Sequence, residues 1–158
     1  MINHWIYEPL KIALVCTHGG HLTETLQLLD TFEDHEIFFA THHSIRDEEL
    51  LQIAPAYFSE NIGERPIRFL FSFCWAFNII RRENPDVILS LGSEIAIPFF
   101  FWSKVFQIKS IYIESWCHIK VLSRTGRIVY WLVDEFWVQW PQLLEVCGSK
   151  VQYHGAVI

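Results

Sequence analysis

The chain has 158 residues, a net charge of −6 at neutral pH, and 51% hydrophobic against 19% charged residues. The negative charge, without a basic patch interleaved with aromatic residues, excludes nucleic acid as an expected partner. Aromatic residues reach 16% and mean hydropathy is +0.21, so the chain either fills a dense core or hides apolar surface against a partner or a membrane.

Short apolar runs typical of strands alternate with helical stretches along the chain. The expected strands are 11–17, 36–41, 56–58, 87–90, 110–113 and 135–139, with one more near the end. The expected helices are 22–32, 47–53, 66–83, 95–106, 127–133 and 142–146. This alternation predicts an α/β fold in one domain over 1–158, a Rossmann-like parallel sheet flanked by helices.

The cysteines, the histidines and the first ten residues limit which kinds of site and membrane contact are expected. The four cysteines form no CxxC pair, so they are expected to be reduced and mostly buried, and the eight histidines show no metal-ligand spacing. We therefore expect neither a metal nor a cofactor. Met1–Leu10 is too short and too polar for a signal peptide or membrane anchor. No run of about 18 apolar residues is present, so any membrane contact should be peripheral.

Polar residues follow three expected strands directly, where ligands of a parallel α/β sheet bind. They are Gly19-Gly20-His21 after the first strand, Glu94 after the strand 87–90, and Glu114 after the strand 110–113. Glycine backbone could approach a phosphate, and a carboxylate could act as base towards a sugar hydroxyl. Simpler interpretations stay open: a tight turn at the glycines, a helix cap at Glu94, and a loop carboxylate at Glu114 that pairs with Arg124 or Arg127.

Two further segments have a composition that suggests binding. Lys120–Tyr130 combines Ser, Thr, Gly and Arg, as a loop facing a diphosphate would, although it is also an ordinary basic loop before a helix. Ile67–Ile80 has almost no polar face, and Ile95–Phe106 adds more aromatic residues. Arg68, Phe71 and Trp75 are candidates for an interfacial membrane contact, with core helices of the sheet as the alternative.

Taken together, the motifs resemble a known family. Gly19-Gly20-His21 with Thr23-Glu24, Pro85–Ile88 with Gly92-Ser93-Glu94, Tyr112–Ser115 with Lys120–Tyr130, and Val138–Pro141 with Tyr153-His154-Gly155 occur in the family's order. They are similar to Alg14-like helper subunits of oligosaccharide and exopolysaccharide glycosyltransferases. These subunits in turn resemble the N-terminal, acceptor-binding half of a GT-B transferase. The family includes the subunit of the eukaryotic enzyme that adds the second N-acetylglucosamine to a dolichol diphosphate carrier, and bacterial capsule proteins.

The resemblance implies one subunit of a two-chain inverting glycosyltransferase, inactive when alone. The two-chain enzyme would move a sugar from a UDP-sugar to a polyprenyl-diphosphate-linked sugar. A donor-binding partner would complete the heterodimer, at the cytoplasmic face of the inner membrane. Because Met1–Leu10 cannot span a bilayer, a bacterial capsule or exopolysaccharide member acting on an undecaprenyl carrier is favoured. His118-Ile119 departs from the family pattern and leaves the acceptor sugar open.

The resemblance also assigns roles to residues. His21 or Glu114 would be the catalytic base, Gly19 and Gly20 would face the diphosphates, and Glu94 the acceptor sugar. The same crevice would be shaped by Ser123, Thr125 and Gly126. Two alternatives remain: a non-catalytic membrane scaffold that only stabilises its partner, and a flavodoxin-like or nucleotide-binding regulator. The second is weaker, because the chain has neither a P-loop nor a dinucleotide fingerprint.

Overall fold

The computed structural model describes residues 8–60 and 66–157, with only the backbone of Pro66. The expectation for Met1–Leu10 falls largely on residues outside these ranges. None of the helices in the described ranges is long and apolar enough to cross a membrane.

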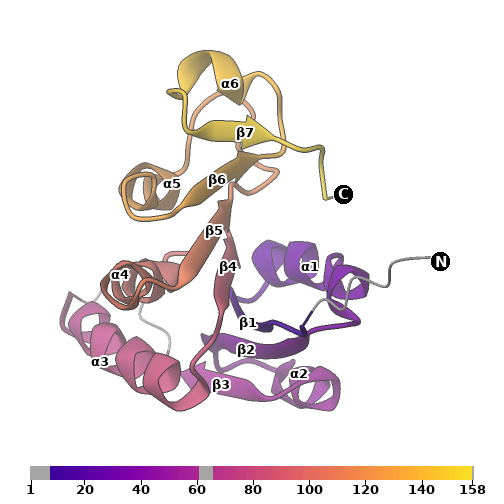
Figure 1. The fold of residues 1–158 in the computed structure, drawn as a ribbon, viewed down its shortest axis with the longest axis vertical. Helices are drawn as coiled ribbons and strands as arrows, with labels where there is room; N and C mark the ends of the chain where they lie inside the picture. The colour runs from indigo at the N-terminus through magenta and orange to yellow at the C-terminus, as the bar shows by residue number, and fades with distance from the viewer. Residues whose placement is uncertain (1–7, 61–65, 158) are drawn as a thin grey trace.

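One seven-stranded, all-parallel sheet organises the chain, in the order β3-β2-β1-β4-β5-β6-β7 (Figure 1). The strands are β1 Lys11–Val15, β2 Glu36–His42, β3 Ala56–Ser59, β4 Val87–Leu91, β5 Lys109–Ile113, β6 Glu135–Val138 and β7 Val151–Tyr153. The order reverses between β1 and β4, which is where open α/β sheets bind ligands.

Helices cover both faces of the sheet. They are α1 Gly20–Leu26, α2 Asp47–Ile53, α3 Pro66–Glu83, α4 Ala96–Phe106, α5 Arg124–Val129 and α6 Leu143–Val146, with a 3-10 turn at Leu29–Phe32. In Figure 1, α3, α4 and α5 lie on one side of the sheet and α1 and α2 on the other. The expected α/β architecture is therefore confirmed.

Each face of the sheet has its own apolar core. Phe38, Phe99 and Phe136 belong to the core that includes residues of α3, α4 and α5. Leu14, Leu22 and Leu50 belong to the core that includes residues of α1 and α2. A sheet covered on both faces accounts for the nearly continuous apolar runs of its central strands.

Two helix boundaries differ from the sequence expectation. The stretch 22–32 is α1 followed by a separate 3-10 turn. The helix expected at 127–133 begins at Arg124, because the Ser123 hydroxyl caps it by accepting a hydrogen bond from the Gly126 amide. Placing its start three residues later missed this serine cap.

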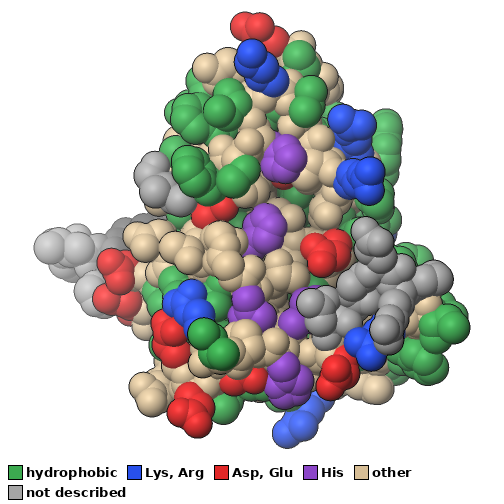
Figure 2. Space-filling view, turned by 180° about the vertical axis from the view of Figure 1, so that it is seen from behind, with side chains coloured by type: hydrophobic (Ala, Val, Ile, Leu, Met, Phe, Trp, Pro, Cys, Tyr) green, Lys and Arg blue, Asp and Glu red, His purple; other side chains and the backbone are tan. Residues whose placement is uncertain are grey.

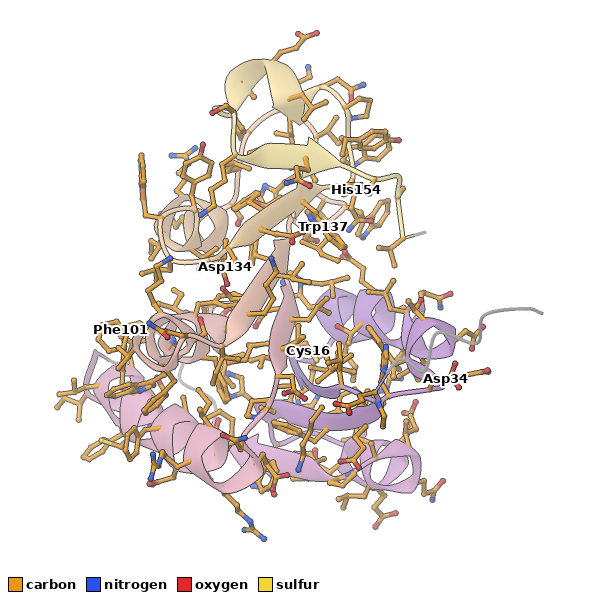
Figure 3. The ribbon with its side chains drawn as sticks, in the orientation of Figure 1. Cys16, Asp34, Phe101, Asp134, Trp137 and His154 are labelled. Atoms are coloured by element: carbon orange, nitrogen blue, oxygen red, sulfur yellow. The ribbon has the colours of Figure 1, made fainter. Side chains whose placement is uncertain are left out.

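The cysteines are free, as expected, but the expectation that most are buried is wrong. Cys16 is buried, Cys74 and Cys117 are exposed, and Cys147 is half-buried. Figure 3 shows Cys16 inside the molecule. Burial raises the pKa of the Cys16 thiol to about 12, so this thiol stays protonated.

The helices α3 and α4 divide their side chains between the core and the surface. Phe99 and Phe100 are buried, whereas Ile67, Leu70 and Phe71 are each about 70% exposed. Phe101 points outward from α4 in Figure 3 and packs edge-on against Phe73 of α3. This side of the molecule therefore presents apolar side chains beyond those that the core requires.

Candidate functional site

The loops that follow β1, β4 and β5 meet at the carboxyl edge of the sheet. A β-carbon placed on Gly92 would lie 2.7 Å from His21 Cε1 and 2.9 Å from Ser115 Cβ. Gly92 also has a φ of +79°, a conformation that favours glycine. Glycine at this position therefore lets His21 and Ser115 lie against the loop after β4.

Glu114 lies at the centre of this edge and is fully buried. Its Oε1 accepts hydrogen bonds from the Ser115 amide at 3.1 Å and the Tyr112 hydroxyl at 3.2 Å. Its Oε2 accepts from the Ser123 amide at 3.0 Å and the Ser123 hydroxyl at 3.1 Å. Burial, and then the Glu114 charge, raise the pKa of Tyr112 well above its ordinary value, so Tyr112 remains a donor.

The four hydrogen bonds that Glu114 accepts indicate a structural role for its carboxylate. A buried carboxylate is tolerated when hydrogen bonds replace its lost hydration, and here hydroxyls and backbone amides do so. Its hydrogen bonds are therefore different from the ion pair with Arg124 or Arg127 that the sequence left open. In this geometry Glu114 fixes the loop between β5 and α5.

The expected substrate-binding residues Ser123, Thr125 and Gly126 form the beginning of α5. Ser123 is half-buried and bonds Glu114, while Thr125 and Gly126 are buried. A β-carbon on Gly126 would overlap Glu114 Oε2. These residues shape the site by holding Glu114.

A second buried carboxylate, Glu24 of α1, joins the same edge. Its Oε1 accepts from the Ser115 hydroxyl at 2.8 Å, and its Oε2 from the Trp116 amide at 3.4 Å. Gln139, which follows β6, donates from Nε2 to Glu24 Oε2 at 2.7 Å and to the Glu114 carbonyl at 3.1 Å. Glu24 thus ties the helix that carries His21 to the loops after β5 and β6.

Glu24 and Gln139 were missing from the candidate residues derived from the sequence. Both belong to the motifs that carry the family resemblance, and that was the available signal. Gln139 also accepts a hydrogen bond from the Val157 amide at 2.9 Å through Oε1. One buried amide therefore links the loop after β6 to the segment that follows β7.

Histidine side chains gather along the middle of the face shown in Figure 2. His18 Nε2 donates a hydrogen bond to the His42 carbonyl. His18 Nδ1 is buried and has no hydrogen-bond partner among the described residues. His42 Nδ1 lies 2.9 Å from the Ser59 hydroxyl, and His42 Nε2 is also buried without a partner in the described ranges.

Glu94 is exposed at the same edge, just before α4. Burial lowers the pKa of His42, and the charge of Glu94 partly opposes that effect, so the two side chains lie within electrostatic range. Gly19 and Gly20 are exposed at the start of α1. The unpartnered nitrogens of His18, His21 and His42 make this edge rich in hydrogen-bonding capacity.

Arg68, Phe71 and Trp75 of α3 lie together beside the end of β3. They line a hollow of about 330 Å³ with Ser59 and Glu60. The Trp75 indole packs edge-on against the buried Phe99, so it is partly a core residue.

No three His, Cys, Asp or Glu side chains within residues 8–60 and 66–157 are arranged to hold a metal ion.

Known structures identify the fold as one Rossmann-like half of a GT-B protein. The fold of MurG from Acinetobacter baumannii matches with a TM-score of 0.77 at 16% identity, over 92% of this chain and 45% of MurG. The UDP-N-acetylglucosamine 2-epimerase from Rickettsia bellii matches with a TM-score of 0.72 at 14% identity, over 94% of this chain and 45% of the epimerase. The chain thus spans about half the length of these proteins.

Residues 57–157 match the family described as "Oligosaccharide biosynthesis protein Alg14 like". The chain belongs to this family. It is 27% identical to the human UDP-N-acetylglucosamine transferase subunit ALG14, over 96% of this chain and 84% of that protein. The ALG14 subunit of Eremothecium gossypii is 33% identical, over 95% of this chain and 81% of the relative.

These relatives confirm the Alg14-like part of the expectation. They come from human and fungal sources and carry the name of a UDP-N-acetylglucosamine transferase subunit. The expectation of a bacterial capsule or exopolysaccharide protein receives no support from them.

The Glu114 geometry predicts a large difference between two glycine substitutions. Gly126→Ala should destabilise the fold by about 1–3 kcal/mol, because its methyl group would displace the Glu114 carboxylate. Gly20→Ala is the matched control, since a β-carbon there meets no atom within 4 Å. Urea denaturation measures both free energies of unfolding, and equal stability of the two variants would contradict the tight packing at Gly126.

Proposed function

We propose that this chain is the acceptor-binding subunit of a two-chain inverting glycosyltransferase that uses a UDP-sugar donor. Its acceptor would be a sugar linked to a polyprenyl diphosphate. The observation that carries the proposal is the meeting of the loops after β1, β4 and β5, with His21 against Gly92 and Ser115. In a Rossmann-like sheet, this is the edge at which ligands bind.

The partner in this proposal is a donor-binding chain. The curated relatives are named transferase subunits, and the matched part of MurG is 45% of that protein. A GT-B transferase binds its two substrates between two Rossmann-like halves. A second chain would accordingly supply the other half, and the heterodimer would be the active species.

Within this proposal His21 is the base and Glu114 the residue that positions the site. His21 is half-buried at the loop junction, and a base needs a lone pair within reach of the acceptor hydroxyl. Glu114 is fully buried and its oxygens already accept four hydrogen bonds. It would act through Ser123, Thr125 and Gly126 on the shape of the crevice.

The exposed residues of the edge would bind the acceptor. Glu94 would accept hydrogen bonds from the sugar hydroxyls, since it is exposed and close to His42. Gly19 and Gly20 would allow close approach of the acceptor, because a β-carbon at either position would meet no atom within 4 Å. No step in this proposal requires a metal or a cofactor.

We also propose a peripheral membrane contact through α3 and α4, at the cytoplasmic face of the membrane. Ile67, Leu70 and Phe71 are about 70% exposed, and Phe101 and Val105 of α4 are 41% and 54% exposed. Arg68 and Lys104 are exposed on the same helices and would face lipid headgroups. Trp75 would contribute only its free edge, because its ring also packs on Phe99.

The catalytic proposal predicts that His21→Ala lowers kcat by about 10²–10⁴ without changing the fold, because proton removal from the acceptor is lost. The assay uses the chain co-expressed with its partner, a panel of UDP-sugars, and both undecaprenyl and dolichyl carriers. His35→Ala is the control, because His35 lies beside the amino end of β2 and bonds the Leu10 amide. Full transfer by the partner alone would instead make this chain a scaffold.

The membrane proposal predicts that Leu70→Glu with Phe71→Glu releases the chain from liposomes, because both side chains lose favourable transfer into the interface. The matched control is Ile45→Glu, at a fully exposed position beside α2. Flotation measures binding, and circular dichroism checks that the fold persists. Unchanged flotation of the folded double variant would exclude α3 as the contact.

A further inference from the structure

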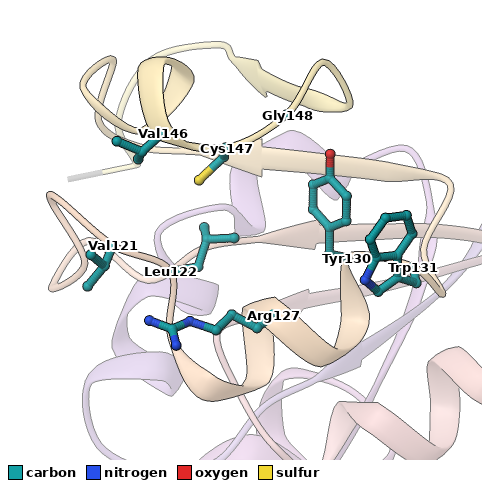
Figure 4. Close-up of a pocket in the computed structure, with 8 residues that line it drawn as sticks. All are labelled: Val121, Leu122, Arg127, Tyr130, Trp131, Val146, Cys147 and Gly148. Carbon is teal, nitrogen blue, oxygen red and sulfur yellow. The ribbon is translucent and has the colours of Figure 1, made fainter.

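A separate apolar cavity of about 520 Å³ lies between α5, the loop before it and the end of α6 (Figure 4). Its apolar walls include Val121 and Leu122 from the loop, Tyr130 and Trp131 after α5, and Val146 at the end of α6. We call this cavity the α5 groove.

The α5 groove exposes more apolar side chain than folding explains. Trp131 is 80% exposed, Val146 64% and Val121 58%. Covering such surface is favourable because apolar side chains leave water. An apolar ligand would therefore gain from lying along these three side chains.

Arg127 is the charged residue in the lining of the groove. Its side chain extends from α5 beneath Leu122 in Figure 4, and Arg124 and Lys120 are exposed nearby in the chain. These cations stand out in a chain whose net charge is −6. An apolar trough with an arginine beside it complements an anionic head joined to an apolar tail.

The groove adjoins the candidate site. Leu122 in its wall directly precedes Ser123, which donates two hydrogen bonds to Glu114. Cys147 also lines the groove, and after burial it is the charge of Glu114 that raises the pKa of its thiol. The groove is therefore next in the chain to the residues that hold Glu114.

We propose that the α5 groove binds the first isoprene units of the polyprenyl carrier, with Arg127 contacting its diphosphate. This inference rests on the proposed function, since it takes a polyprenyl diphosphate as the acceptor's carrier. The groove then fixes the position of the acceptor sugar relative to His21. The helices α3 and α4 lie on the same side of the sheet as α5 in Figure 1. Their exposed apolar side chains would contact the membrane lipid around the carrier.

Cys147 provides a direct test of occupancy. In the full chain carrying Cys74→Ser and Cys117→Ser, Cys147 is the reactive thiol, because Cys16 is buried. Geranylgeranyl diphosphate at ten times its Kd should slow alkylation of Cys147 by N-ethylmaleimide about tenfold, because only the free protein reacts. Inorganic diphosphate or geranylgeraniol at the same concentration should protect much less.

Arg127→Gln tests the cation in the same assay. It should weaken geranylgeranyl diphosphate binding by about tenfold or more, the effect of losing a charge-assisted hydrogen bond. Each rate is compared with the alkylation rate of the same variant without ligand. Arg81→Gln, on α3 and outside the groove, is the matched control and should bind as the unsubstituted chain does.

The possible outcomes separate this inference from the proposed function. If the prenyl diphosphate does not protect Cys147 in a preparation that still transfers sugar with its partner, the groove assignment alone is overturned. Protection by the partner chain but not by the prenyl diphosphate would make the groove a protein interface and would also overturn it. Protection without any transfer activity would support lipid binding and count against the proposed reaction.

Discussion

Two buried carboxylates, Glu24 and Glu114, organise the carboxyl edge on which the rest of the site depends. Their hydrogen-bond donors are hydroxyls, backbone amides and the Gln139 amide, with no lysine or arginine among the described residues. Removing any one of these donors should destabilise the fold, because the carboxylate would stay buried with one hydrogen bond fewer. The network therefore fixes α1, the loop after β5 and the start of α5 in one arrangement.

The sequence predicted the fold well because its signals are local. Apolar runs, Pro66 and Pro85 locate the strands and the long helix without knowledge of the tertiary contacts. The position of His21, Glu94 and Glu114 at the carboxyl edge also follows from the sequence, because each of them comes after a strand of a parallel sheet. The burial of Glu114 does not, because it depends on the hydroxyls of Tyr112 and Ser123.

Other parts of the site depend on contacts that are distant in sequence. Glu24 meets Ser115 and Gln139 across 91 and 115 residues, so no local pattern predicts that it is buried. The expectation that most cysteines are buried was wrong at Cys74 and Cys117 for the same reason, since composition does not say which face of an element meets the core. In contrast, α3 combines both alternatives that the sequence left open, because Trp75 packs against the core while Phe71 lies at the surface.

The central claim is that the acceptor binds at the edge built around Glu114. Hydrogen–deuterium exchange of the heterodimer, with and without a polyprenyl-diphosphate-linked sugar, tests this most directly. The account predicts slower exchange in peptides that cover 17–21, 92–95 and 115–127 when the acceptor is present. Unchanged exchange in all three segments, with the acceptor bound at saturation, would contradict it.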